Sequence, residues 1–196
     1  MAIEQELHDI DRPLEGSKYG DLELDEFMVF CILDTACPYE MVCKAFDELR
    51  EMGMTTRKEI MKWREDMIEN ALKRAGYRFP KQHAGRIKKF GYSSIDLKTA
   101  TREELVENIT GIGMKLASMF LRNTRGEDHA VIDVHTERWL MGELMKTHRG
   151  KIKPPKTYEE KERYFKEIAK AKGKTTKELD LEIWQKMRIG NRKSKA

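Results

Sequence analysis

The stretch ITGIGMKLASMF, residues 109–120, places two glycines and a lysine inside an otherwise apolar helical pattern. A glycine inside a helix costs about 1 kcal/mol relative to alanine, so one continuous helix through this stretch is unfavourable. A helix that ends near Ile109, a turn through Gly111 and Gly113, and a second helix that begins at Met114 fit the pattern better. The sequence therefore predicts a helix-hairpin-helix.

Lys115 lies at the start of the second predicted helix. The N–H groups in the first turn of a helix have no carbonyl partner within it. At a hairpin they would face outward, where they can hold a phosphate without reading base sequence. A plain turn between two helices uses similar residues, so these positions alone leave both interpretations open.

Helical spacing of apolar residues extends over most of the chain. Thr101 and Glu104 have the spacing of a capping box, and the segment 150–156 has the composition of a basic linker. We find no convincing strand pattern and no repeat, which predicts an all-α fold. The expected helices cover residues 24–33, 39–52, 56–76, 101–109, 131–145, 158–173 and 175–187.

The chain has 196 residues, of which 39% are hydrophobic, and this suffices for one sizeable core or for two small lobes that share one. No stretch approaches the roughly 20 apolar residues of a membrane span, and the acidic N-terminal segment is unlike a signal peptide. We therefore expect a cytoplasmic protein. Cys31, Cys37 and Cys43 include no CxxC pair, which favours reduced thiols over a zinc site or a disulfide framework.

Charge is unevenly distributed along the chain. Residues 1–30 hold nine acidic side chains against two basic ones, whereas residues 149–196 hold sixteen lysines and arginines against seven acidic side chains. A polyanion would interact with the C-terminal part far more favourably than with the N-terminal part. The alternative is a solvated surface of the kind found in Lys/Glu-rich proteins.

Asp133 follows an apolar triplet in AVIDVHTERW, residues 130–139, and stands eighteen positions after Lys115. It precedes a predicted helix, where a carboxylate suits the positive end of the helix dipole. A helix N-cap is the ordinary role of an aspartate at such a place, so the residue alone does not indicate catalysis.

Five segments of the chain form a recognisable series: FCILDTACPYEMVCKAF (30–46), GYRFPKQHAGRI (76–87), ITGIGMKLASMFLRN (109–123), AVIDVHTERWL (130–140) and LDLEIW (179–184). In this order they resemble the helix-hairpin-helix base-excision DNA glycosylases, and in particular the second type of 8-oxoguanine DNA glycosylase. The resemblance implies one all-α glycosylase domain over residues 1–196, with the active site in a cleft between two lobes. Residues 28–110 would form one lobe, and the N-terminal segment with residues 111–196 the other.

The resemblance implies that Lys115 is the nucleophile, whose neutral amine attacks C1′ of the damaged nucleotide and expels the base. The resulting imine can undergo β-elimination, which nicks the strand. We expect sparse hydration at the hairpin to favour the neutral amine. Asp133 matches the aspartate that stabilises the oxocarbenium-like sugar, a role that an amide of the same shape cannot fill.

Phe79 and Trp184 match positions that stack on the two faces of the extruded base. Packing in the core is the alternative for both, because aromatic side chains at helical spacing are most often buried. Tyr77 and Arg78 resemble residues that fill the gap left by base flipping or contact the opposite base. Further DNA contacts are expected at Gly111, Gly113 and His135.

Two departures from the family pattern concern lesion recognition. DTACP (34–38) replaces the Asn or Gln that relatives often carry after the first apolar helix, and RIGNRKSKA (188–196) runs a few residues beyond the C-terminal carboxylate that helps them recognise 8-oxoguanine. The iron–sulfur cluster of the endonuclease-three branch would need four cysteines near the C-terminus, and none follows Cys43. We expect no metal and no cofactor.

These features predict a bifunctional DNA glycosylase and AP lyase of base-excision repair that acts on double-stranded DNA containing a damaged purine, with 8-oxoguanine as first choice. Hypoxanthine or an alkylated purine is the alternative substrate. A non-catalytic DNA-binding module and a monofunctional glycosylase, in which Asp133 activates water, are alternatives of other classes. A DNA-binding module without catalytic activity would have no use for the presence of both Lys115 and Asp133. We further expect a monomer in the nucleoid of a prokaryotic cell, without membrane contact.

Overall fold

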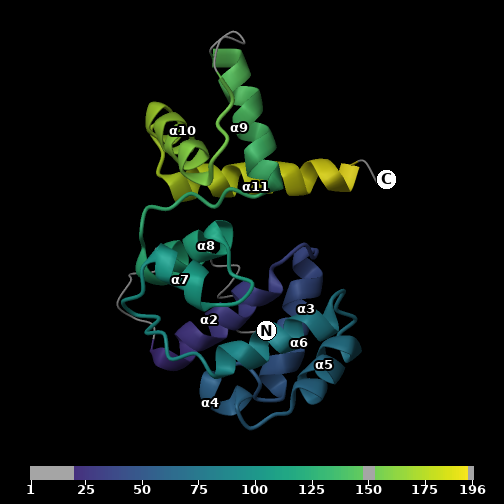
Figure 1. Cartoon of the computed structure of the whole chain (residues 1–196). Helices are drawn as coiled ribbons and strands as arrows, with labels where there is room; N and C mark the ends of the chain where they lie inside the picture. The colour runs from purple at the N-terminus through teal and green to yellow at the C-terminus, as the bar shows by residue number, and fades with distance from the viewer. Residues whose placement is uncertain (1–19, 148–152, 194–196) are drawn as a thin grey trace. The chain divides into compact units, whose positions relative to one another are not determined.

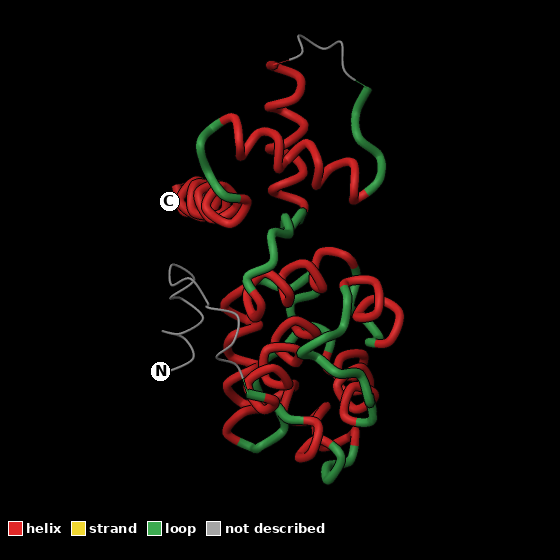
Figure 2. The backbone as a smooth tube through the Cα atoms, turned by 90° about the vertical axis from the view of Figure 1, so that its left-hand side faces the viewer, coloured by secondary structure: helices red, strands yellow, loops and turns green. Residues whose placement is uncertain are grey.

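The computed structural model describes residues 20–147 and 153–193, with side chains up to residue 186. The acidic segment before residue 20, residues 150–152 of the predicted linker and the last three residues of the basic tail lie outside this range. Every regular element in the described range is a helix, so the predicted all-α fold is confirmed (Figures 1 and 2). The helices are α2 (Asp21–Leu33), α3 (Tyr39–Glu51), α4 (Arg57–Ile60), α5 (Glu65–Arg74), α6 (Pro80–Gly91), α7 (Arg102–Asn108), α8 (Met114–Arg125), α9 (Val134–Thr147), α10 (Tyr158–Ala171) and α11 (Thr176–Lys193).

The chain folds into two compact units, which divide after Gly126. The first unit contains α2 to α8, and the second contains α9 to α11. Leu116 and Phe120 of α8 are buried in the same core as α2, which is why α8 belongs to the first unit. The sequence predicts a lobe boundary between residues 110 and 111. That boundary differs from the division after Gly126, and it stays a prediction.

The most completely buried helix of the first unit is α2. All residues from Phe27 to Leu33 are buried, so this part of the helix is apolar on every side. A helix of this kind has to be covered all round, and α3, α6 and α8 pack against it. The apolar run that the sequence predicts as a helix is therefore a core helix.

Asp25 is the charged side chain that α2 buries. It accepts hydrogen bonds from the Arg57 backbone N–H at 2.8 Å and from Arg57 Nε at 2.7 Å. Arg57 Nη1 also donates to the carbonyls of Ser93, at 3.3 Å, and Ile95, at 2.7 Å. Burial raises the pKa of Asp25, and the bonds from Arg57 oppose that shift. The pair thus ties α2 to α4 and to the loop before α7.

Residues 56–76 form two helices, α4 and α5, rather than the single helix that their spacing predicts. The ammonium group of Lys88, on α6, donates hydrogen bonds to the carbonyls of Ile60, Met61 and Trp63. A cation at the last carbonyls of a helix stabilises its C-terminal end. A side chain from a different helix therefore favours the break after α4, and no local pattern indicates it.

Three helices of the described range begin with capping boxes, one of which is formed by Thr175 and Glu178 at the start of α11. Thr101 and Glu104 form the one predicted at the start of α7, and Thr157 and Glu160 form a second at the start of α10. In each, the threonine hydroxyl accepts a backbone N–H bond and the glutamate carboxylate accepts one in return. Hydrogen bonds from backbone N–H groups lower the pKa of all three glutamates.

In the second unit α9, α10 and α11 pack pairwise against one another. Trp139 of α9 lies edge-on to Phe165 of α10, with ring centroids 5.9 Å apart and an interplanar angle of 67°. The fully buried Leu140 and Phe165 belong to a core that Leu179 and Ile183 of α11 complete. This core is separate from that of the first unit.

The three cysteines form no disulfide, as the sequence predicts. Cys31 and Cys43 are buried, and Cys37 is half-buried. Burial raises the pKa of the Cys31 thiol well above its ordinary value. Among the helices described here, none is long and apolar enough to cross a bilayer.

Ala36, in the loop between α2 and α3, has φ +54°, a left-handed conformation that costs a residue with a Cβ roughly 1–2 kcal/mol. Ala36→Gly should therefore raise the free energy of unfolding by up to about 1 kcal/mol, because the greater freedom of glycine in the unfolded chain offsets part of the gain. Urea denaturation measures this change. The control Ala75→Gly makes the same substitution at φ −68° and should be destabilising. Equal losses in both variants would contradict the prediction.

Candidate active site

The predicted helix-hairpin-helix lies within the first unit, where α7 ends at Asn108 and α8 begins at Met114. Gly111, in the turn, has φ +95°, a conformation that favours glycine. A Cβ at this position would also meet Cδ of Arg86 at 2.7 Å. Glycine thus allows both the turn and the close approach of Arg86 from α6.

Gly113 has a different environment from Gly111. It is the extended N-cap residue of α8, with φ −110° and ψ −178°, and a Cβ there would meet no atom within 4 Å. The N–H groups in the first turn of α8 have no carbonyl partner within the helix, and no side chain caps them. These N–H groups and the positive end of the helix dipole suit an anion such as a phosphate. The open space at Gly113 would let such a group approach.

Lys115, the second residue of α8, donates a hydrogen bond from Nζ to Oδ2 of Asp34 at 2.6 Å. The two side chains are 31% and 20% exposed, so the ion pair is half-buried but reachable from solvent. Asp34 is the C-cap residue of α2. The hairpin pattern predicts a sparsely hydrated amine at this place, and the structure gives that amine a carboxylate partner.

Asp34 is a site residue that the sequence analysis missed. An acidic group at the C-terminal end of a helix is unfavourable next to the negative end of the helix dipole. In this sequence Asp34 follows the apolar run of α2 directly. This unfavourable position is the signal that could have indicated a cationic partner.

Phe79, a predicted base-stacking residue, lies half-buried directly before α6. Its ring stacks on His83 with a centroid distance of 6.1 Å and an interplanar angle of 28°. The guanidinium group of Arg78, which is exposed, lies over the Phe79 ring at 5.1 Å. The ring is therefore held from within the protein and covered by a side chain that can move.

His83 links this aromatic site to the hairpin. Arg86 Nη1 lies 3.2 Å from His83 Nε2, and because arginine can only donate, Nε2 is the acceptor. Nδ1 then carries the proton, which it donates to the carbonyl of Phe79 at 3.1 Å. Burial lowers the pKa of His83, which favours this neutral ring. A continuous series of contacts thus runs from Phe79 to Arg86 and Gly111.

Tyr77, predicted to contact DNA, is only 4% exposed. Its hydroxyl donates to the carbonyl of Leu33 at 2.5 Å, and its ring lies edge-on to His83 with centroids 5.1 Å apart. Burial raises the pKa of this hydroxyl well above its ordinary value. In this conformation Tyr77 is a core residue, because its polar atom is used inside the protein.

In the second unit Asp133 immediately precedes α9, and its Oδ1 accepts a hydrogen bond from the Thr136 N–H at 2.7 Å. This is the geometry of an N-cap. For Oδ2 we find no partner among the described residues, so capping leaves one carboxylate oxygen available. Thr136 is itself buried and donates from Oγ1 to Oδ1 of Asp180, on α11, at 3.2 Å.

His135 and Trp184 also lie in the second unit, and both are half-buried. The Nδ1 atom of His135 is buried and has no hydrogen-bond partner in the part of the chain that the structure describes. The predicted site residues of the first unit are Gly111, Gly113, Lys115, Tyr77, Arg78 and Phe79, and those of the second are Asp133, His135 and Trp184.

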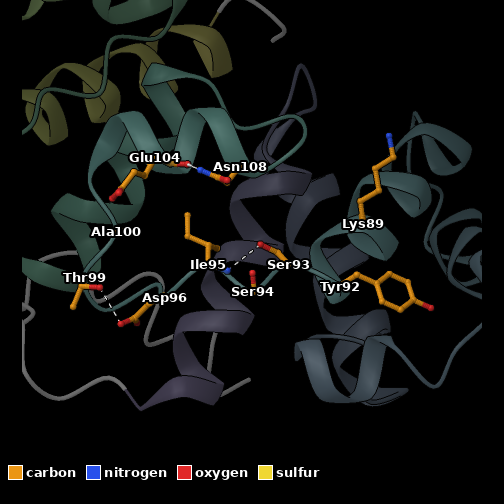
Figure 3. Close-up of a pocket in the computed structure, with 10 residues that line it drawn as sticks. All are labelled: Lys89, Tyr92, Ser93, Ser94, Ile95, Asp96, Thr99, Ala100, Glu104 and Asn108. Atoms are coloured by element: carbon orange, nitrogen blue, oxygen red, sulfur yellow. Dashed lines mark hydrogen bonds between the residues drawn. The ribbon is translucent and has the colours of Figure 1, made fainter.

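A polar pocket of about 430 Å³ opens on the first unit (Figure 3). It is lined by residues of the loop from Tyr92 to Ala100 together with Lys89, Glu104 and Asn108, and by none of the predicted site residues. The Asp96 carboxylate in this loop accepts bonds from neighbouring loop residues. The hydrogen bonds of the Asp96 carboxylate therefore stabilise the conformation of this loop. No group of three His, Cys, Asp or Glu side chains in the described ranges could hold a metal ion.

Comparison with known proteins gives consistent matches. A family model described as 8-oxoguanine DNA glycosylase matches residues 15–174. The 8-oxoguanine DNA glycosylase/AP lyase of Metallosphaera sedula is 34% identical over 167 residues, which cover 80% of this chain and 78% of that protein. The crystal structure of Methanocaldococcus jannaschii 8-oxoguanine DNA glycosylase matches with a TM-score of 0.71 at 29% identity, covering 95% of this chain and 89% of that chain.

The M. jannaschii 8-oxoguanine glycosylase/lyase in complex with a 15mer DNA containing 8-oxoguanine gives a TM-score of 0.70 at 26% identity. This match covers 97% of this chain and 92% of that chain. The family model spans the hairpin with Lys115 and the segment with Asp133. The chain therefore belongs to the 8-oxoguanine DNA glycosylase family, within the helix-hairpin-helix DNA glycosylase superfamily.

Proposed function

We propose that Lys115 is the nucleophile of this chain, an 8-oxoguanine DNA glycosylase/AP lyase of base-excision repair. The observation that carries the proposal is the position of the amine. It lies on the second residue of an uncapped helix behind a glycine turn, in a chain that matches the family over residues 15–174. A phosphate on the hairpin N–H groups would hold the DNA backbone close to this amine.

In the proposed reaction, the lone pair on Nζ of Lys115 attacks C1′ of the damaged nucleotide. The bond between C1′ and the base breaks, its electrons go to the base, and the base takes up the proton that the attacking nitrogen loses. The sugar ring then opens to an imine, and loss of a proton from C2′ expels the 3′ phosphate. Because Nζ donates to Asp34 in the protein without DNA, the amine must leave Asp34 and lose a proton before it attacks.

We propose that Asp133 stabilises the positive charge that develops on the sugar. Its capping bond through Oδ1 orients the carboxylate, and Oδ2 is the oxygen that would face the charge. The N-cap and the catalytic role therefore use different atoms of one side chain. An asparagine could keep the cap but could not supply the charge.

For the extruded base we propose stacking on Phe79 and Trp184. The Arg78 guanidinium covers the Phe79 ring in the protein without DNA, so it must move before a base can stack there. Arg78 and His135 then contact the DNA, as do the backbone groups at Gly111 and Gly113. Tyr77 keeps its core position in this proposal.

The proposed partner is double-stranded DNA containing 8-oxoguanine. Support comes from the M. jannaschii relative, whose crystals contain DNA with this lesion. We propose that the two units act as one monomeric glycosylase domain, in two lobes, on the nucleoid inside the cell. Hypoxanthine and alkylated purines are the competing substrates.

Borohydride trapping tests the nucleophile. Lys115→Gln should abolish the covalent complex with lesion-containing DNA, because the amide cannot form an imine. Duplex affinity should change little, since the hairpin N–H groups are retained. The control Lys44→Gln removes an exposed lysine of the same unit and should trap like the parent protein. Undiminished trapping by Lys115→Gln would exclude this residue as the nucleophile.

Single-turnover base release tests Asp133. Asp133→Asn should slow release by about a hundredfold or more, because the charge is needed most in the transition state. DNA affinity and thermal stability should be almost unchanged, because asparagine caps a helix about as well as aspartate. Asp133→Ala, which removes both cap and charge, is the comparison for stability. A loss of affinity equal to the loss of rate would favour a purely structural role.

Competing lesions test the substrate. Rates of base release from duplexes with 8-oxoguanine, hypoxanthine, an alkylated purine or undamaged guanine are compared under single-turnover conditions. The rate with 8-oxoguanine should be highest, and guanine should be rejected strongly, because a site that pairs with the N7–H of the lesion leaves a buried acceptor unpaired with guanine. Faster release of hypoxanthine would make it the preferred substrate instead.

A further inference from the structure

The segment that leads to Asp133 has no helical or sheet partner for its backbone, yet Ala130, Val131 and Ile132 are buried. Buried backbone N–H and C=O groups are almost always hydrogen-bonded, because an unpaired group costs the free energy of its lost hydration. In this segment the hydrogen bonds come from side chains of α10. Two residues one turn apart, Tyr158 and Glu162, supply them.

Tyr158 holds two peptide units with one hydroxyl. The hydroxyl donates to the carbonyl of Ala130 at 2.7 Å and accepts from the N–H of Ile132 at 3.1 Å. These bonds lie on either side of Val131, so they set the path of the chain across this residue. Ile132 is the residue directly before Asp133.

Glu162 holds the same segment from one helical turn further along. Its Oε1 accepts a hydrogen bond from the Ala130 N–H at 3.0 Å, and the side chain is only 8% exposed. His129 Nδ1, at 3.5 Å, and Lys166 Nζ, at 3.6 Å, lie next to the same oxygen. A carboxylate at such depth is stable only with partners of this kind. Both polar backbone groups of Ala130 are therefore bound by α10.

The helix that carries these two residues is itself well anchored. The capping box of Thr157 and Glu160 fixes its first turn, where Tyr158 lies. Phe165 and Ala169 are buried in the core of the second unit. The support for the segment is therefore part of a rigid element rather than of another loop.

Asp133 is consequently held from both sides. Before it, Tyr158 binds the N–H of Ile132, and after it, its own Oδ1 and carbonyl accept bonds from Thr136 and Glu137 at the start of α9. Misplacement of a catalytic group by about 1 Å can cost a hundredfold in rate. A carboxylate that must face a developing charge needs this kind of support.

We propose that Tyr158 and Glu162 are positioning residues for Asp133: they act on the excision step through the backbone of residues 130–132, without touching the substrate. The proposal rests on the catalytic role proposed above for Asp133. It assigns to α10 a part in the chemistry that the sequence pattern of this helix does not indicate.

Tyr158→Phe is the sharpest test, because it removes only the hydroxyl. We expect single-turnover release of 8-oxoguanine to fall about tenfold, with DNA affinity unchanged. Imine trapping at a preformed abasic site should stay within about twofold, because this step needs Lys115 but no longer passes through the charged sugar that Asp133 stabilises. The matched control is Tyr164→Phe, a half-buried tyrosine of the same helix, and it should leave both rates unchanged.

Two variants separate the outcomes. Asp133→Asn should show the same pattern as Tyr158→Phe with a larger loss; if its base release is unchanged, the proposed role of Asp133 fails. If Asp133→Asn is slow and Tyr158→Phe is normal, the positioning proposal fails alone. Equal losses of base release and abasic-site trapping in Tyr158→Phe would mean general damage and would also overturn it.

Glu162→Gln is measured in the same way, and it decides the matter if Tyr158→Phe does not fold. The amide keeps an acceptor oxygen for the Ala130 N–H but loses the charge beside His129 and Lys166. We expect a selective loss of base release that is smaller than that of Glu162→Ala, which removes the acceptor altogether. Unchanged base release in both variants would contradict the proposal.

Discussion

A helical segment that is apolar on every side must be covered on every side, and the segment from Phe27 to Leu33 of α2 imposes this constraint on the first unit. The helices that cover it, α3, α6 and α8, include the one that carries Lys115. Asp25, in the second turn of α2, and Asp34, at its C-cap, each have a cation as partner: Arg57 for Asp25, and Lys115 for Asp34. The packing that builds the core thus also brings a charged group to the proposed nucleophile.

Features that depend on neighbours in the sequence could be predicted. The hairpin follows from the conformational freedom of Gly111 and the cost of glycine inside a helix, and the start of α7 follows from the spacing of Thr101 and Glu104. Each involves a few consecutive residues, so the pattern contains the physical cause. The proposed roles of Lys115 and Asp133 have a further basis, since the spacing and context of these residues resemble a family.

Features that depend on contacts distant in the sequence could not be predicted in this way. Asp34 is 81 positions from Lys115, and Glu162 is 32 positions from the backbone group that it binds. The end of α4 depends on Lys88, which comes from another helix. Two aromatic residues near the start of α6 make the same point: the resemblance implies base stacking for Phe79 and contact with the DNA for Tyr77, and only tertiary packing makes Tyr77 a core residue. Non-local partners decide both the helix break and the surroundings of the site.

The ion pair between Lys115 and Asp34 has a consequence for the protein when no DNA is bound. A nucleophilic amine reacts with any accessible carbonyl compound, and a cell contains many small aldehydes and sugars. In the ion pair with this carboxylate, the ammonium nitrogen has no lone pair to offer such a molecule. If Lys115 is the nucleophile, as proposed above, this contact would protect it from glycation while no DNA is bound.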